Sequence, residues 1–119
     1  MPDRIIGHDT AKTSILRLPS CVTDFVPYRF PGQADSGSSG LFALKVALID
    51  LGYDRAVLCG VPMDRMAAHF FDSHPWGGAE SHKRGWRQAL PEIKDRARSM
   101  SGWTREILGE PTTEWLTRA

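Results

Sequence analysis

The chain has 119 residues, a length that fits one domain with a buried core. Its hydrophobic fraction of 41% and charged fraction of 24% are those of an ordinary globular protein. A formal net charge of +1 gives no electrostatic argument for binding nucleic acid or an acidic membrane surface, so neither is expected as a partner.

The N-terminal segment, residues 1–35, carries the weakest structural pattern. Residues 1–10 lack the apolar stretch of a signal peptide, and no later run reaches membrane-spanning length, so we expect a cytoplasmic protein. Residues 13–18 predict a short strand. Residues 22–30 are rich in β-prone side chains, but Pro27 interrupts them and favours an edge strand or an extended segment.

The strongest predicted element is a helix over residues 40–51, which follows a small, polar loop over residues 31–39. Apolar side chains cover most of its circumference, which indicates a helix packed hard against a sheet. Ser38 or Ser39 is expected to cap the N-terminus, and Gly52 is expected to end the helix in the left-handed conformation.

A short strand follows over residues 55–59, and its nearly continuous apolar character predicts that both faces are covered. Cys59 is expected to be buried there as a small hydrophobe. Residues 60–82 form a long connection rich in His and Gly, which is typical of a binding loop. The next helix is predicted over residues 83–94, with Pro91 expected to kink it or end it early.

The last predicted elements are a strand over residues 96–100 and a helix that Gly109 closes. Helices that alternate with short apolar strands indicate the α/β class. We therefore predict a single domain over residues 1–119 with a small, mostly parallel sheet flanked by helices. Its core spans residues 36–109, and residues 110–119 form a tail.

Three loops are expected to meet at one edge of this sheet. A helix between parallel strands runs opposite to them, so the loop over residues 37–40 should face the loop over residues 60–64. Ser101 and Gly102 join them if the last strand is parallel to its neighbour. Ligands of open α/β sheets bind outside the carboxyl ends of the strands, so this edge is the predicted site.

The loop before the first helix has the chemistry of an anion site. Gly37 and Gly40 allow close approach of the backbone, and Ser38 and Ser39 add hydroxyls to the free amides of the first turn. The run SGSSG is neither a Walker A loop nor a GxGxxG fingerprint. A plain serine-capped turn and a contact to phosphate or sugar therefore remain equal alternatives.

Three histidines, His69, His74 and His82, lie close together in the sequence, with Asp64 among the acidic residues nearby. One of them could serve as general acid or base or bind a ligand, and a polar, partly exposed loop is the simpler interpretation. A metal site is the least favoured alternative, because their spacing matches no zinc motif, and no metal ligands are predicted. His82 has the best position, because it immediately precedes a helix.

The basic residues of the C-terminal third are interleaved with acidic ones, which favours a solvated surface over a phosphate-binding patch. They are Lys83, Arg84, Arg87, Lys94, Arg96, Arg98 and Arg105. Trp86 and Trp103 occupy amphipathic positions and are expected in the core. Trp76, between a proline and a glycine, is the better candidate for a stacking contact or a lid anchor.

Residues 36–64 resemble a known pattern, a glycine- and serine-rich helix followed by LGYxxxxLxGxxxD. The pattern occurs in 6-hydroxymethylpterin diphosphokinase MptE-like proteins and in bacterial sialyltransferases with a Rossmann-like, GT-A-type fold. Small bacteriophage proteins of unassigned function look closer still, including over residues 96–116. The resemblance implies a Rossmann-like sheet that binds a nucleotide.

The matching positions imply which residues contact that nucleotide. In these families the Ser/Gly loop before the helix does so, which here means Ser38, Ser39 and Gly40. A late segment of strand plus serine also lies near the nucleotide, and Ser101 and Gly102 resemble it.

The resemblance also implies catalytic residues. Asp64 corresponds to the acidic residue after the LxG strand, and a histidine before the next helix would be His82, with His74 as the competitor. Two features depart from the pattern. Those enzymes begin with a strand and an asparagine-bearing loop that grips the nucleotide, and no comparable segment precedes residue 36. The chain is also far shorter than these enzymes.

The leading hypothesis is a protein that binds a nucleotide or nucleotide-sugar and transfers a glycosyl or diphosphoryl group, with a homo-oligomer as one way to complete the site. The alternative is a non-catalytic, phage-type accessory or protein-interaction module that retains a Rossmann-like fold. The missing N-terminal strand favours the alternative, whereas the histidine-rich loop favours an enzyme.

Overall fold

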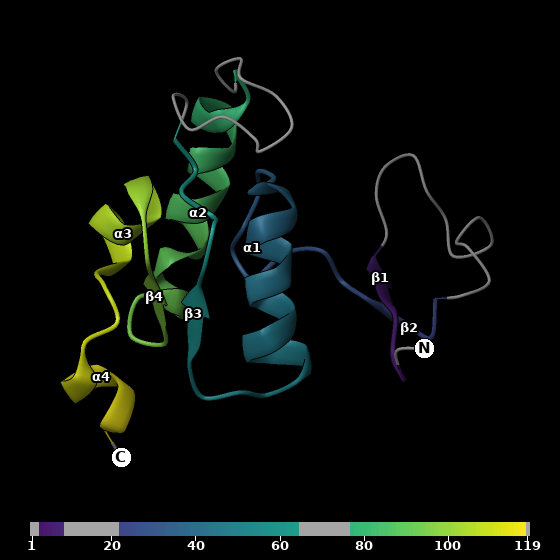
Figure 1. Ribbon diagram of the computed structural model, residues 1–119. Coiled ribbons are helices and arrows are strands. Elements are labelled where there is room, and N and C mark those ends of the chain that lie inside the picture. The colour runs from purple at the N-terminus through teal and green to yellow at the C-terminus, as the bar shows by residue number, and fades with distance from the viewer. Residues whose placement is uncertain (1–2, 9–21, 65–76, 119) are drawn as a thin grey trace.

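Short strands and longer helices alternate along the chain, and the strands form two separate parallel sheets (Figure 1). The computed structural model describes residues 3–8, 22–64 and 77–118. The sheets pair β1 (Ile6–His8) with β2 (Asp24–Val26) and β3 (Ala56–Leu58) with β4 (Ala97–Ser99). The predicted α/β class is confirmed, but two sheets take the place of the single sheet expected.

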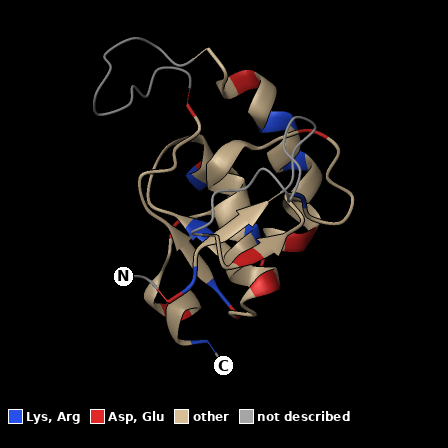
Figure 2. Ribbon diagram, turned by 90° about the vertical axis from the view of Figure 1, so that its right-hand side faces the viewer, with Lys and Arg blue, Asp and Glu red and all other residues tan. Residues whose placement is uncertain are grey.

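The helices flank the β3–β4 sheet, and α1 lies between it and the N-terminal sheet (Figure 1). They are α1 (Ser38–Lys45), η2 (Val46–Asp50), α2 (Ala79–Ile93), α3 (Gly102–Leu108) and α4 (Thr113–Thr117). None of these helices in the described segments is long and apolar enough to cross a membrane. Acidic and basic segments are interspersed along the ribbon (Figure 2).

The first predicted helix is confirmed, but it changes register partway. α1 runs directly into the π-helix η2, in which the N–H of Leu51 donates to the carbonyl of Val46 at 2.8 Å. Gly52 then ends the helix with φ of 72°, the left-handed conformation that the sequence predicts. The wider π turn also brings Lys45 and Asp50 together, and their Nζ and Oδ2 atoms lie 2.7 Å apart.

The second predicted helix is longer than expected. α2 begins at Ala79 and continues through Pro91 to Ile93. Pro91 lies in the last turn, where its missing N–H removes one helical hydrogen bond without preventing the final residues from staying helical. The predicted early end is therefore wrong.

The core lies between these two helices and the inner face of the β3–β4 sheet. Leu58 and Ala97 point inward from the strands and are buried. The helical part of the cluster consists of Leu41, Leu44, Leu48, Trp86, Ala89, Ile93 and, on α3, Leu108. Trp86 is fully buried, as the sequence predicts. Burial of these side chains is the main source of stability for so short a chain.

The opposite face of the same sheet is open. Val57 is 36% exposed and Met100 is 53% exposed, and Cys59 also reaches the surface. The expectation that this strand is covered on both faces, with a buried Cys59, is wrong. The reason is that the core helices pack on the face to which Leu58 points, whereas alternate residues of a strand point to the other side.

The N-terminal sheet lies on the far side of α1 from β3 (Figure 1). β2 ends before Pro27, which confirms the predicted interruption. His8 at the end of β1 packs against Phe42 of α1, with ring centroids 4.5 Å apart, and Tyr28 lies 4.3 Å from His8. This aromatic cluster joins the sheet to the helix. The strand predicted over residues 13–18 lies outside the described residues.

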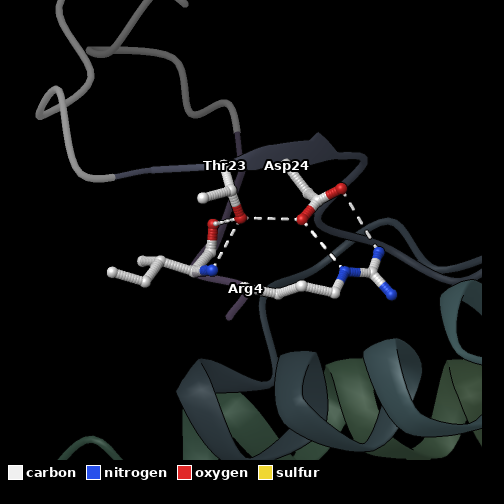
Figure 3. A network of polar contacts seen from close by, with 4 residues as sticks. Arg4, Thr23 and Asp24 are labelled. Atoms are coloured by element: carbon white, nitrogen blue, oxygen red, sulfur yellow. Dashed lines mark hydrogen bonds and ion pairs between the residues drawn. The ribbon is translucent and has the colours of Figure 1, made fainter. Parts of the chain in front are cut away.

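A polar network ties the edge of β2 to the start of the chain (Figure 3). The Arg4 guanidinium donates to both carboxylate oxygens of Asp24, at 3.1 and 3.2 Å, and the Thr23 hydroxyl donates to the same carboxylate at 2.8 Å. The hydrogen bond from Arg4, followed by that from Thr23, holds the pKa of Asp24 below its ordinary value.

We expect the Arg4→Gln substitution to raise the pKa of Asp24 toward the ordinary aspartate range. A lowered pKa in the folded state means that the ion pair stabilises the β1–β2 pair fully above the unfolded pKa, and loses this effect as the pH falls through the folded pKa. Carboxyl ¹³C titration by NMR measures the midpoint directly. The exposed Lys94→Gln substitution serves as the control, and equal midpoints in the Arg4→Gln and native chains would contradict the assignment.

Candidate functional site

The loops over residues 36–40, 60–64 and 101–104 come together at the carboxyl end of the β3–β4 sheet. A Cβ atom added to Gly40 would lie 2.6 Å from Cγ1 of Val61, so the first two loops touch through the bare backbone of this glycine. Gly102 approaches Asp64 in the same way, with 2.6 Å between an added Cβ and the carboxylate Oδ2. The glycines therefore permit the contact between the loops.

Asp64 holds the start of α3 in place. The backbone N–H of Trp103 donates to its Oδ1 at 3.1 Å, so this carboxylate caps the first turn from outside the helix. Thr104 adds a hydrogen bond from its hydroxyl to the carbonyl of Val61 at 2.6 Å. The same hydroxyl lies 2.7 Å from that of Ser99 in the interior. Asp64 therefore has a structural role in addition to any role toward a ligand.

Helix α2 clamps the loop before α1. His82 Nδ1 lies 3.0 Å from the carbonyl oxygen of Ser36, and the indole N–H of Trp86 donates to the carbonyl of Gly37 at 2.9 Å. Gln88 accepts from the backbone amides of the same loop through its Oε1. Gly85 leaves room for the loop, because a Cβ there would lie 2.7 Å from the backbone nitrogen of Gly37.

The cap of α1 differs from the prediction. Neither Ser38 nor Ser39 caps the helix through its side chain, and the hydroxyl of Ser36 accepts from the N–H of Ser38 at 3.1 Å instead. Ser38 already lies inside the first turn with φ of 69°, so its own side chain cannot reach back to the amides. The Tyr28 hydroxyl, 2.8 Å from that of Ser36, fixes this cap.

Two residues of the converging loops adopt a strained backbone conformation. Among the described residues other than glycine, Ser38 and Met63 are those with positive φ, at 69° and 57°. Such conformations cost on the order of 1 kcal/mol and gather at ligand clamps and active sites. Within the described parts of the chain the hydroxyls of Ser38, Ser39 and Ser101 make no hydrogen bond, so they can serve a ligand.

Two basic side chains border this edge and were not singled out in the sequence as site residues. Nζ of Lys83 lies 5.1 Å and Cζ of Arg87 lies 5.3 Å from the ring centroid of Trp103. Trp103 is partly buried and packs against the core cluster, so its predicted place in the core is confirmed only in part. The sequence could have indicated this pair of cations, because Lys83 and Arg87 are four residues apart and such residues share one face of a helix.

The predicted catalytic residues lie on two sides of the edge. His82 contacts the loop at Ser36, and Asp64 contacts the start of α3. His74, His69 and Trp76 lie outside the described residues. In the segments that the structure describes, no group of three or more His, Cys, Asp or Glu side chains is arranged to hold a metal ion.

Comparisons with known proteins add no relative. Neither models of protein families, nor curated protein sequences, nor solved structures give a match to the chain. The resemblance to the MptE-like and sialyltransferase families therefore stays a prediction, and the geometry of the site carries the functional argument.

Proposed function

We propose that the chain binds a nucleotide or nucleotide-sugar at the carboxyl edge of the β3–β4 sheet. The observation that carries the proposal is the convergence of three loops there, in which Gly40 touches Val61 and Gly102 touches Asp64. Ligands of parallel α/β sheets bind at this edge, because the loops that leave the strands gather there.

The chemistry around the edge fits a phosphate group. The hydroxyls of Ser38 and Ser39 stand at the start of α1, where the helix dipole favours an anion. Lys83 and Arg87 add positive charge beside Trp103, and an aromatic ring can stack on a base. The strain at Ser38 and Met63 agrees with a binding role.

The reaction that we propose at this binding site is group transfer. His82 would act as general acid or base, with its Nδ1 oriented by the Ser36 carbonyl, and Asp64 would position an acceptor hydroxyl. A Rossmann-like fold, of which the parallel β3–β4 pair is the central part, belongs to the same proposal.

Thermal-shift measurements with CMP, CTP, GTP and nucleotide-sugars test the binding step. A ligand that binds only the folded chain raises the melting temperature, by an amount that grows with its concentration. We expect the Lys83→Gln/Arg87→Gln double substitution to weaken binding of the responding nucleotide about tenfold, because two charge-assisted contacts are lost.

The Arg84→Gln substitution is the matched control, since Arg84 is exposed on the same helix and makes no contact with Trp103. Its affinity should equal that of the native chain. No stabilisation by any of these ligands at millimolar concentration would contradict the proposed function. An equal effect of the control and the double substitution would contradict the role given to Lys83 and Arg87.

A further inference from the structure

Of the two edges of the β3–β4 sheet, the described segments close one and leave the other open. β4 is closed on its outer side, because the N–H of Ser99 donates to the carbonyl of Gly109 at 3.0 Å. On the inner side of the pair, the N–H of Ala56 donates to Arg96 at 2.9 Å, and the carbonyl of Leu58 accepts from Met100 at 3.0 Å.

This register decides where the backbone of Val57 points. In a strand the hydrogen-bonding groups alternate between the two edges, so residues on either side of Val57 face β4 and Val57 itself faces outward. No hydrogen bond in the described chain uses its N–H or carbonyl. The outer edge of β3 is therefore an unpaired strand edge, which can accept another strand.

Val57 also lines an open groove of about 550 Å³. It runs between the start of β3 and α4, and its lining consists of Tyr53, Asp54, Arg55, Ala56, Val57, Trp115, Leu116 and Arg118. Three of these apolar side chains reach the surface, since Tyr53 is 62%, Leu116 51% and Val57 36% exposed. The groove thus has apolar contact surface next to free backbone groups.

The charge of the groove is positive and its cations are fixed in position. Arg55 donates from Nη1 to the carbonyl of Leu116 at 2.9 Å and lies over the ring of Trp115 at 5.8 Å. Arg118 donates from Nη2 to the carbonyl of Asp95 at 3.1 Å. Each guanidinium keeps further N–H groups for a ligand, and among the described lining residues Asp54 is the one with a carboxylate side chain.

We propose that the outer edge of β3 and this groove bind an extended, acidic peptide segment of a partner protein, which joins the sheet as a third strand. The backbone of the peptide would pair with the N–H and carbonyl of Val57. Alternate side chains of a strand share one face, so acidic residues would meet Arg55 and Arg118 while apolar groups pack on Leu116.

The charges favour such a peptide over a second copy of the chain. In a symmetric dimer each groove would face the same groove, and the arginines at positions 55 and 118 would then face one another. Like charges across an interface disfavour binding, whereas carboxylates opposite these arginines favour it. The inference is independent of the proposed nucleotide site, which lies at the opposite, carboxyl end of the strands.

Fluorescence anisotropy with labelled octapeptides tests the inference. The probe alternates valine and glutamate, one control alternates valine and lysine, and a second control carries N-methyl groups on alternate amides of the glutamate peptide. We expect saturable binding of the probe and about tenfold weaker binding of both controls, since one loses charge complementarity and the other loses strand pairing.

Substitutions in the protein locate the contact. Arg118→Glu should weaken binding of the glutamate peptide about tenfold, whereas Arg105→Glu, an exposed change on α3, should leave it unaltered. Val57→Pro removes the outward N–H without touching the bonds to β4. Should that variant not fold, the N-methylated peptide still tests strand pairing.

Three results would overturn the inference. The first is the absence of binding of the glutamate peptide at millimolar concentration. The second is equal binding of the N-methylated peptide, which would show that charge alone binds the peptide, without strand pairing. The third is dimerisation of the chain in sedimentation equilibrium with a dissociation constant that Arg118→Glu alters, because a second copy would then occupy the groove.

Discussion

Replacing Gly85 with alanine is expected to lower the free energy of unfolding by about 3 kcal/mol. In an exposed helix the same change would stabilise by up to about 1 kcal/mol, because alanine is the better helix former. Here an added Cβ would lie 2.7 Å from the backbone of both Ser36 and Gly37 and would also meet the carbonyl oxygen of Asp35.

The expected loss is large because those neighbours are backbone atoms. A flexible side chain could turn away, whereas the loop can move only by giving up its hydrogen bonds to α2. The bond between the Trp86 indole and the Gly37 carbonyl, and that between His82 and Ser36, would be the first to lengthen. Nucleotide affinity should fall together with stability, since the same loop begins α1.

Urea denaturation measures the change. Gly77→Ala is the control, because a Cβ at that position would meet nothing within 4 Å, and its effect should stay below about 0.5 kcal/mol. A Gly85→Ala chain as stable as the native one would contradict the close packing of the loop on α2.

The Lys45→Met substitution is expected to destabilise the chain by about 3 kcal/mol. The side chain of Lys45 is 3% exposed and that of Asp50 is 15% exposed, so removal of the ammonium leaves a largely buried carboxylate without its partner. Adding Asp50→Leu should recover most of the loss, because an apolar pair of similar volume needs no compensating charge.

The ion pair should also control the register of η2. Residues five apart in an α-helix point about 140° away from each other, since the helix has about 3.6 residues per turn. The π turn brings Lys45 and Asp50 onto one side. In the double variant we therefore expect Leu51 to lose its bond to Val46 and the turn to become α-helical.

Urea denaturation of both variants and of Lys94→Met, an exposed control, measures the energies. Backbone chemical shifts of residues 46–50 report the register. If Lys45→Met alone were neutral, or if the shifts stayed the same in the double variant, the ion pair would determine neither stability nor register.

The sequence predicted those parts of the fold that depend on neighbouring residues. Apolar periodicity located the first helix, and Gly52 and Gly109 marked helix ends because left-handed φ, at 72° and 91°, favours glycine. The division into two sheets was not predicted, since strand pairing joins residues far apart and leaves no local pattern. The same limit explains the exposed Cys59, because an apolar strand looks alike whether one face or both faces are covered.

The candidate site was predicted in outline and missed in detail. The order of loops and strands indicated that Gly40, Asp64 and Gly102 would come near one sheet edge. The clamp by His82 and Gln88 on the loop before α1 joins side chains to backbone across 46 to 54 residues, and no spacing in the sequence indicates such bonds. Ser36 took the capping position because Ser38 turned into the left-handed region.

The closed edge of β4 has a consequence for aggregation. Fibres grow by strand addition only when a sheet offers two free edges, because each incoming strand must leave a new edge for the next. With Gly109 bonded to Ser99, the β3–β4 sheet can extend from the Val57 side alone. Two copies that met there would bury each other's open edge, and no edge would remain for a third copy. Strand addition at this sheet therefore stops at a dimer.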